Sequence, residues 1–193
     1  MIKYLAALAI CYSSLSIANN EFSDFFNSFE TLSADFNQKT TDEHGAIVAS
    51  TTGYLKFKRP AQFIWQTQQP IDQTLLLNNN ELWLIDHELE QASMRNIDEL
   101  KNTPLYWLLN RPEQLKTLPT FERESQGIRW YRTQEFNKLS FGFTNNQLTA
   151  IQLNNQLGQT VLVRFKNVIS NSAMSQNIFK LKLNKDFDVI RSF

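Results

Sequence analysis

The stretch that decides the fold runs from Gly53 to Trp65 and reads GYLKFKRPAQFIW. Leu55 and Phe57 alternate with polar residues, and a period of two is typical of a β-strand that buries one face. Arg59 falls on the same face as these two residues if the strand continues that far. Pro60 then ends the strand, because proline has no N–H to donate to a neighbouring strand.

Arg59 is the unexpected residue of this stretch, because an unpaired charge on the apolar face of a sheet is unfavourable. A second apolar strand opens shortly after it with Phe63, Ile64 and Trp65. A guanidinium at the rim of an aromatic surface predicts either a ligand site or a latch between elements. The alternative is an arginine at a strand end whose charged head reaches back to water.

Length and charge limit the choice of function. The 193 residues are enough for one domain with a sizeable core. Lysine plus arginine number 19, as do aspartate plus glutamate. The chain therefore lacks the basic surplus of a nucleic-acid-binding protein, and no nucleic acid is expected as a partner.

The start of the chain has the pattern of a secretory signal peptide. Lys3 gives a positive start, a mostly apolar run follows, and Ser16 to Ala18 resemble a cleavage site. We therefore expect a signal peptide at 1–18 and a single domain at 19–193. The apolar run is too short for a comfortable transmembrane helix, so no stable membrane insertion is expected.

The single cysteine, Cys11, lies inside this leader. Ile10 precedes it, where a lipoprotein-processing site would have a small residue, so lipidation at Cys11 is not favoured. The exported domain would contain no disulfide and no thiolate, although its compartment permits disulfides.

The rest of the chain predicts strands with a few short helices. Residues 20–32 place apolar side chains at helical spacings of three and four, with Asn20 as the expected N-cap. Segments 33–41 and 46–59 alternate as a hairpin of long strands. Further strands are predicted at 73–77, 81–86, 90–95, 120–124, 128–133, 138–144, 147–154, 160–168 and 178–183.

The strand pattern is interrupted after residue 95. Ile97, Leu100, Leu105 and Leu108 follow helical spacing. Thr103 is followed by proline, which is typical of an N-cap and the first position of a helix. Two short apolar helices are therefore predicted here, and such helices could cover the open side of a sheet as a lid.

These patterns predict a mainly β fold with short α-helices: an incomplete, open antiparallel β-barrel of about eleven strands covered by a helical lid. A sheet that curls this far either fills its concave face with side chains or leaves a ligand cavity. The candidate ligand and lid residues are Leu55, Phe57, Arg59, Phe63, Trp65, Leu75, Leu77, Ile97, Leu100, Leu105 and Leu108.

The sequence contains no recognised catalytic or cofactor motif. His44 and His87 stand alone at a predicted turn and a predicted strand end, so a metal site is not indicated. No glycine pattern for cradling phosphate is present. Neighbouring carboxylates such as Asp86 and Glu88 are common on extended chain and indicate a solvated surface. We expect no enzymatic activity, no cofactor and no metal.

The central stretch carries a resemblance to a known family. Gly53 to Gln66, Asn79 to Trp83 and the preceding Leu32 to Gln38 resemble the periplasmic outer-membrane lipoprotein carriers of the LolA family. Asn102 to Pro104 stands at the helical insertion of that family. Phe179 to Ile190 is similar to its closing strand and tail.

The resemblance implies a monomeric periplasmic carrier that takes the acyl chains of lipoproteins into a hydrophobic cavity closed by helices. It implies that Arg59 bonds to the lid backbone and keeps the empty form shut, and that Phe63 matters for accepting cargo. The implied partners are an inner-membrane lipoprotein-releasing ABC transporter and an outer-membrane acceptor lipoprotein. Asn79-Asn80 and Asn184-Lys185 depart from the family pattern, but both are turn positions and concern local loop shape.

Three other functions remain open. One is the outer-membrane-anchored acceptor of the same pathway, which needs a processed, lipid-bearing cysteine. Another is a periplasmic binding protein for a different amphiphile, such as a glycolipid or a lipid-like precursor. A hydrolase whose site is assembled only by the fold is the third.

Overall fold

The computed structural model describes residues 20–134, 139–155 and 157–191, and the predicted signal peptide lies outside them. The helical elements are α1 (Glu21–Ser28) and α2 (Pro104–Leu109) with the 3-10 helices η1 (Ile97–Asn102), η2 (Pro112–Gln114) and η3 (Gln176–Phe179). The strands are β1 (Thr31–Thr41), β2 (Ile47–Lys58), β3 (Gln62–Gln69), β4 (Gln73–Asn78), β5 (Glu81–Asp86), β6 (Gln91–Arg95), β7 (Thr120–Ser125), β8 (Ile128–Arg132), β9 (Ser140–Thr144), β10 (Gln147–Asn154), β11 (Thr160–Ser170) and β12 (Asp188–Arg191).

All of these strands form one sheet in the order β12-β6-β5-β4-β3-β2-β1-β11-β10-β9-β8-β7. The pairs are antiparallel except β12, which runs parallel to β6. The two outer strands of this order do not pair with each other, so the sheet is open. The predicted mainly β, open architecture with short helices is confirmed, with twelve strands and one parallel pair.

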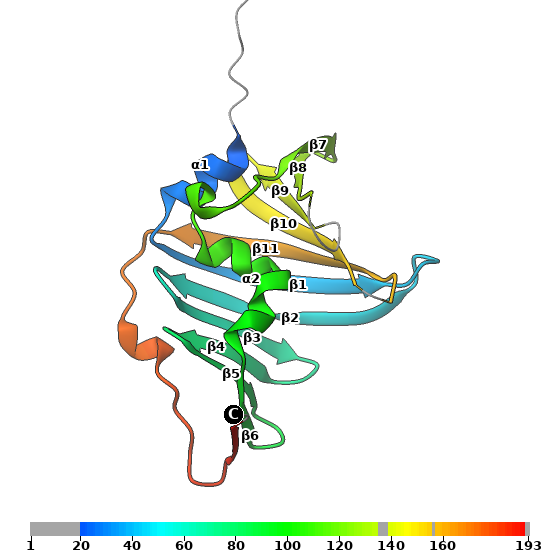
Figure 1. The fold of residues 1–193 in the computed structure, drawn as a ribbon. Helices are drawn as coiled ribbons and strands as arrows, with labels where there is room; N and C mark the ends of the chain where they lie inside the picture. Colours follow the sequence, from blue (N-terminus) through cyan, green and yellow to red (C-terminus); the bar gives the residue numbers. More distant parts are fainter. Residues whose placement is uncertain (1–19, 135–138, 156, 192–193) are drawn as a thin grey trace, which may run out of the picture.

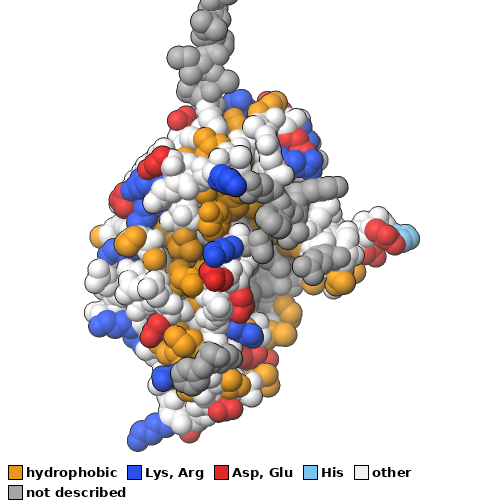
Figure 2. Space-filling model, viewed as in Figure 1, with side chains coloured by type: hydrophobic (Ala, Val, Ile, Leu, Met, Phe, Trp, Pro, Cys, Tyr) orange, Lys and Arg blue, Asp and Glu red, His pale blue; other side chains and the backbone are white. Residues whose placement is uncertain are grey.

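The segment between β6 and β7 has to cross the sheet, because these two strands lie near its opposite edges. This crossing segment carries η1, α2 and η2 in front of the sheet (Figure 1). The helical interruption predicted after residue 95 is therefore confirmed. We call the face that it crosses the inner face. Hydrophobic side chains gather on this side of the molecule (Figure 2).

One part of the inner face is filled by α1, which packs on β9 and β10. Phe22, Phe25 and Phe26 of this helix are buried, as its helical spacing predicts. The ring of Phe22 lies 5.1 Å from that of Phe141 in an edge-to-face arrangement. Asn20 occupies the N-cap position, but its side chain makes no capping hydrogen bond.

A second apolar cluster lies on the outer face of β3 to β6. Ile64, Leu76 and Trp83 point outward there, while their sequence neighbours point inward. The tail after β11 covers this cluster, and Phe179 of η3 is fully buried in it. Coverage on both faces explains why these strands read as continuous apolar runs.

The prediction of a strand at 178–183 is wrong. Residues 176–179 form η3, and the following residues pair with no strand. Ile178, Leu181 and Leu183 pack against the outer cluster. An extended tail with one side against the protein shows the same alternation as a strand, but it makes no ladder.

Candidate functional site

Arg59 lies directly after the last residue of β2. Its backbone N–H donates to the carbonyl of Glu30 at 2.9 Å, which continues the pairing of β1 and β2 by one step. Its side chain turns to the inner face, where the guanidinium lies 5.0 Å from the ring centroid of Phe29 and 5.5 Å from that of Phe57. The sequence prediction that this side chain faces the apolar side is confirmed.

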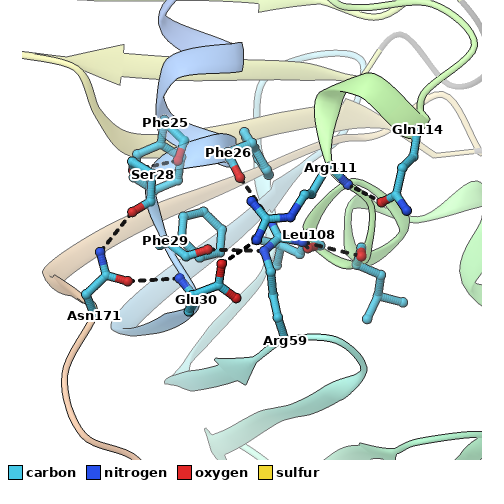
Figure 3. Close-up of polar contacts among 11 residues, drawn as sticks. Phe25, Phe26, Ser28, Phe29, Glu30, Arg59, Leu108, Arg111, Gln114 and Asn171 are labelled. Carbon is cyan, nitrogen blue, oxygen red and sulfur yellow. Dashed lines mark hydrogen bonds and ion pairs between the residues drawn. The ribbon is translucent and has the colours of Figure 1, made fainter.

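The guanidinium of Arg59 donates to four backbone carbonyls (Figure 3). Nη2 lies 2.8 Å from the oxygen of Phe26, and Nε lies 3.1 Å from that of Phe29. Nη1 lies 3.4 Å from the oxygen of Leu108 and 3.5 Å from that of Leu109. Arg59 therefore joins the C-terminal ends of α1 and α2.

These carbonyls are available because the last turn of a helix leaves its C=O groups without partners inside the helix. The residues that follow both helices, Phe29 and Asn110, have extended backbones instead of the left-handed turn that often satisfies such groups. A cation also suits the negative end of a helix dipole. Arg59 supplies that charge to two helices at once.

Burial lowers the pKa of Arg59 below its ordinary value, and the nearby positive charge of Arg111 lowers it further. Glu30 and Glu113 act in the opposite direction. Arginine has so high an ordinary pKa that the group stays charged at neutral pH. The electrostatic attraction to the helix carbonyls is therefore retained.

The helix α1 has other attachments to the sheet. Asn171, after β11, donates from Nδ2 to the carbonyl of Ser28 and accepts from the backbone N–H of Glu30, both at 2.8 Å. At the other end of the helix, Arg129 of β8 donates to the buried carboxylate of Glu21 at 3.2 Å. Removal of the Arg59 contacts would leave α1 held at both ends.

The helix α2 is held differently. Thr103 caps it by accepting from the N–H of Leu105 at 3.2 Å, as predicted. Leu105 and Leu108 are its buried residues. Beyond the helix, Arg111 forms an ion pair with Glu30 (Figure 3). Arg59 and this ion pair are side-chain attachments that the described residues provide near the C-terminal end of α2.

Beneath α2 lies a cavity of about 230 Å³. Its lining is almost wholly apolar, with Gln38 and Thr103 as the polar contributors. Phe36 stacks on the cavity residue Trp65 with ring centroids 4.0 Å apart. Gly53 permits this packing, because a Cβ at that position would lie 2.8 Å from the Phe36 ring and 1.9 Å from a backbone oxygen. The residues that line the cavity are Gln38, Trp65, Leu75, Thr103, Pro104, Leu105, Leu108, Ile151, Leu153, Val161, Val163 and Phe165.

The structure brings some of the predicted site residues together at this cavity and places others in the core. Trp65, Leu75, Leu105 and Leu108 line it. Leu55 and Leu108 line a small adjoining hollow of about 10 Å³. The remaining residues lie elsewhere: Phe57, Phe63, Leu77 and Leu100 are in the buried inner cluster, and Ile97 is exposed.

The sequence reasoning missed two parts of the site. The first is the wall contributed by β10 and β11, where Val161, Val163 and Phe165 share one face. Their alternation predicts the strand at 160–168, but alternation alone does not say which distant strand lies opposite. The second is the pair of α1 carbonyls that accept from Arg59, since a backbone acceptor has no sequence signature.

The site offers no arrangement for holding a metal in the part of the chain that the structure describes. His44 and His87 are both exposed, and the His87 ring lies 2.9 Å from the hydroxyl of Thr74. Within the same residues no helix is long and apolar enough to cross a membrane. What the site provides is apolar space under a short helix.

Known proteins are similar to this chain in sequence and in fold. The chain is 28% identical to the outer-membrane lipoprotein carrier protein of Hahella chejuensis over an alignment of 209 positions, gaps included. The alignment covers 99% of this chain and 98% of the relative. It is 32% identical to that of Pseudomonas fluorescens over 172 residues, which cover 84% of this chain and 82% of the relative.

The solved structure of an uncharacterized conserved protein from Thermus thermophilus has a TM-score of 0.58 at 12% identity, covers 89% of this chain and 98% of its own, and shows the fold alone. The sequence model of the family described as outer membrane lipoprotein carrier protein LolA matches residues 27–182. The protein therefore belongs to the LolA family of outer membrane lipoprotein carriers.

Proposed function

We propose that the protein carries acylated lipoproteins through the periplasm and shelters their acyl chains under α2. The observation that carries this proposal is an apolar cavity beneath a helix that one arginine holds by its backbone carbonyls. The family is one of carriers and not of enzymes, and it works in the periplasm. A cleaved signal peptide at 1–18 would bring the chain there.

A carrier is needed because acyl chains are strongly excluded from water. Exposure costs about 0.8 kcal/mol per CH₂ group, so a multiply acylated protein faces on the order of tens of kcal/mol on leaving a membrane unassisted. An apolar cavity removes most of this penalty. Trp65, Leu75 and Phe165 would provide its walls.

The lid has to open to admit cargo. The cavity of about 230 Å³ is smaller than the roughly 300–1,000 Å³ of pockets that hold a single drug-sized ligand. The closed form would therefore be the empty form. Arg59 would bond to α2 only while α2 covers the cavity, so it would stabilise the closed state over the open one. Only such a difference between the two states can drive cargo onward.

The direction of transport would come from partners. The sequence has no phosphate-binding glycine motif, so the work of extraction would be done by an inner-membrane ABC transporter. An outer-membrane acceptor lipoprotein would then receive the cargo. Phe63 would matter for the first of these steps, as the family resemblance implies.

The test is to purify the protein from the periplasm and to identify bound molecules by lipid extraction and mass spectrometry. Lipoproteins with intact acyl chains are the expected cargo. A glycolipid or another amphiphile in their place would support a different binding protein. A lipid attached covalently to the chain would identify the membrane-anchored acceptor.

A further inference from the structure

A second hollow, of about 290 Å³, lies on the inner face at the β12 edge of the sheet. We call it the β5–β6 groove. It is separate from the cavity under α2, because the two share no lining residue. Its walls include Gln73, Leu84, Gln91, Ser93, Arg95 and Ile190.

The groove adjoins the cavity under α2. Leu75 of the cavity pairs directly with Leu84 of the groove across β4 and β5, which places the two strands about 5 Å apart. Gln73 precedes Leu75 by two positions on the same face, about 7 Å along the strand. The two hollows are therefore neighbours across the β4–β5 pair.

The chemistry of the groove differs from that of the cavity. Among the described residues, the side chains of Gln91, Ser93 and Arg95 have no hydrogen-bond partner, so their donors and acceptors are available. Asp86 is already engaged, because it accepts from Gln73 at 2.8 Å and from the backbone N–H groups of Glu88 and Leu89. The free groups are thus an amide, a hydroxyl and one guanidinium.

Such a set suits a polypeptide backbone. An amide and a hydroxyl donate to and accept from peptide groups of any sequence, while Leu84 and Ile190 provide apolar contact. A single guanidinium gives little selection by charge. An acyl chain, in contrast, has no donor or acceptor to pair with these side chains.

We propose that the β5–β6 groove binds the polypeptide segment that follows the acylated N-terminal residue of the cargo. This inference rests on the proposed function. The acyl chains and the polypeptide start from the same residue, so the segment must begin within a few ångströms of the cavity when the chains are inside. The groove is the hollow that adjoins the cavity there, and its side chains recognise backbone instead of a particular sequence.

The experiment compares two probes on the purified protein. One is a palmitoylated cysteine that carries a short serine–glycine peptide, and the other is the same palmitoylated cysteine without the peptide. We expect the peptide to strengthen binding at least about threefold in the wild type. Ser93→Trp should abolish that gain and leave the binding of the peptide-free probe unchanged. Lys166→Trp, at an exposed position on β11, is the matched control and should behave as the wild type.

The double variant Gln91→Ala, Arg95→Ala removes two exposed side chains and serves if Ser93→Trp does not fold. It should reduce the peptide gain in the same way. Equal binding of the two probes by the wild type would overturn the proposal for the groove and leave the proposed role of the cavity under α2 unaffected. Failure of both probes to bind would instead refute the proposed function, and the groove with it. Loss of the peptide-free probe in the groove variants would show that these residues serve the acyl cavity.

Discussion

Arg59 holds Leu108 by its backbone, with Nη1 3.4 Å from the carbonyl oxygen. The bond does not use the leucine side chain, which is free to line the cavity. A substitution within α2 therefore leaves the acceptor in place, whereas Arg59 is the one guanidinium among the described residues that donates to it. The contact therefore depends on the side chain of Arg59, which follows directly after β2, and on the backbone of α2.

Arg59→Leu should keep the fold and retain acyl ligand. Hydrogen bonds from a charged group are worth about 1.5–3 kcal/mol each, and their loss weakens the closed state relative to the loaded one. We expect release of a bound fatty-acid probe to slow at least about tenfold, measured by stopped-flow fluorescence. Equal release rates for variant and wild type would end the latch model. Arg123→Leu, which removes an arginine paired with Glu122, is the matched control.

Arg111→Leu should change release much less. Its ion pair with Glu30 is partly open to solvent, with side-chain exposures of 32% and 65%, and exposed pairs are worth about 0–1 kcal/mol. We expect less than about a threefold change, which should vanish near 1 M salt, where the screening length is about 3 Å. A change as large as that of Arg59→Leu would show that α2 is held mainly by the ion pair.

Leu153→Trp should block the cavity. Leu153 lines the space of about 230 Å³, so the larger ring has room beneath α2 and occupies the place of the ligand. We expect acyl affinity to fall at least about tenfold, which corresponds to about 1.4 kcal/mol, in a fluorescence titration. Ile169→Trp, at a position of β11 that is 54% exposed, is the control. Unchanged affinity in Leu153→Trp would place the acyl chains elsewhere.

Phe63→Ala should act on stability. The side chain is 2% exposed, and truncation of a buried phenylalanine typically costs about 3–5 kcal/mol. The free energy of unfolding, measured by urea denaturation, should fall by that amount. A loss below about 1 kcal/mol would show that Phe63 is not packed in the core in solution. Any effect of this variant on cargo transfer has to be compared with the wild type at equal concentrations of folded protein.

Asp86→Asn should make the protein less sensitive to acid. The hydrogen bond from Gln73 holds the pKa of Asp86 below its ordinary value, and bonds from Leu89 and Glu88 act in the same direction. A carboxyl with a lowered folded pKa stabilises the protein above the unfolded pKa of about 3.9, and this contribution is lost as the pH falls through the folded value. Urea denaturation in that range should show a shallower decline for the variant. An identical decline for variant and wild type would exclude the turn formed by Asp86, Glu88 and Leu89 as a source of acid sensitivity.

The sequence predicted those parts of the fold and site that depend on local periodicity. Alternation through Leu55 and Phe57 placed Arg59 on the apolar side, and the structure confirms it although β2 ends at Lys58. Helical spacing and the Thr103 cap located α2. The same logic failed at residues 178–183, because an extended tail against the outer cluster alternates like a strand.

The sequence by itself determined most of the strands, the helices α1 and α2 and the presence of a charge at an apolar rim, because each follows from spacing along the chain. Only the tertiary structure decided what the charge meets: backbone carbonyls of Phe26 and Leu108, which lie far from Arg59 in sequence and carry no mark of their own. It also decided that β10 and β11 complete the cavity wall. Both depend on the order of the strands, which long-range packing sets and local pattern does not.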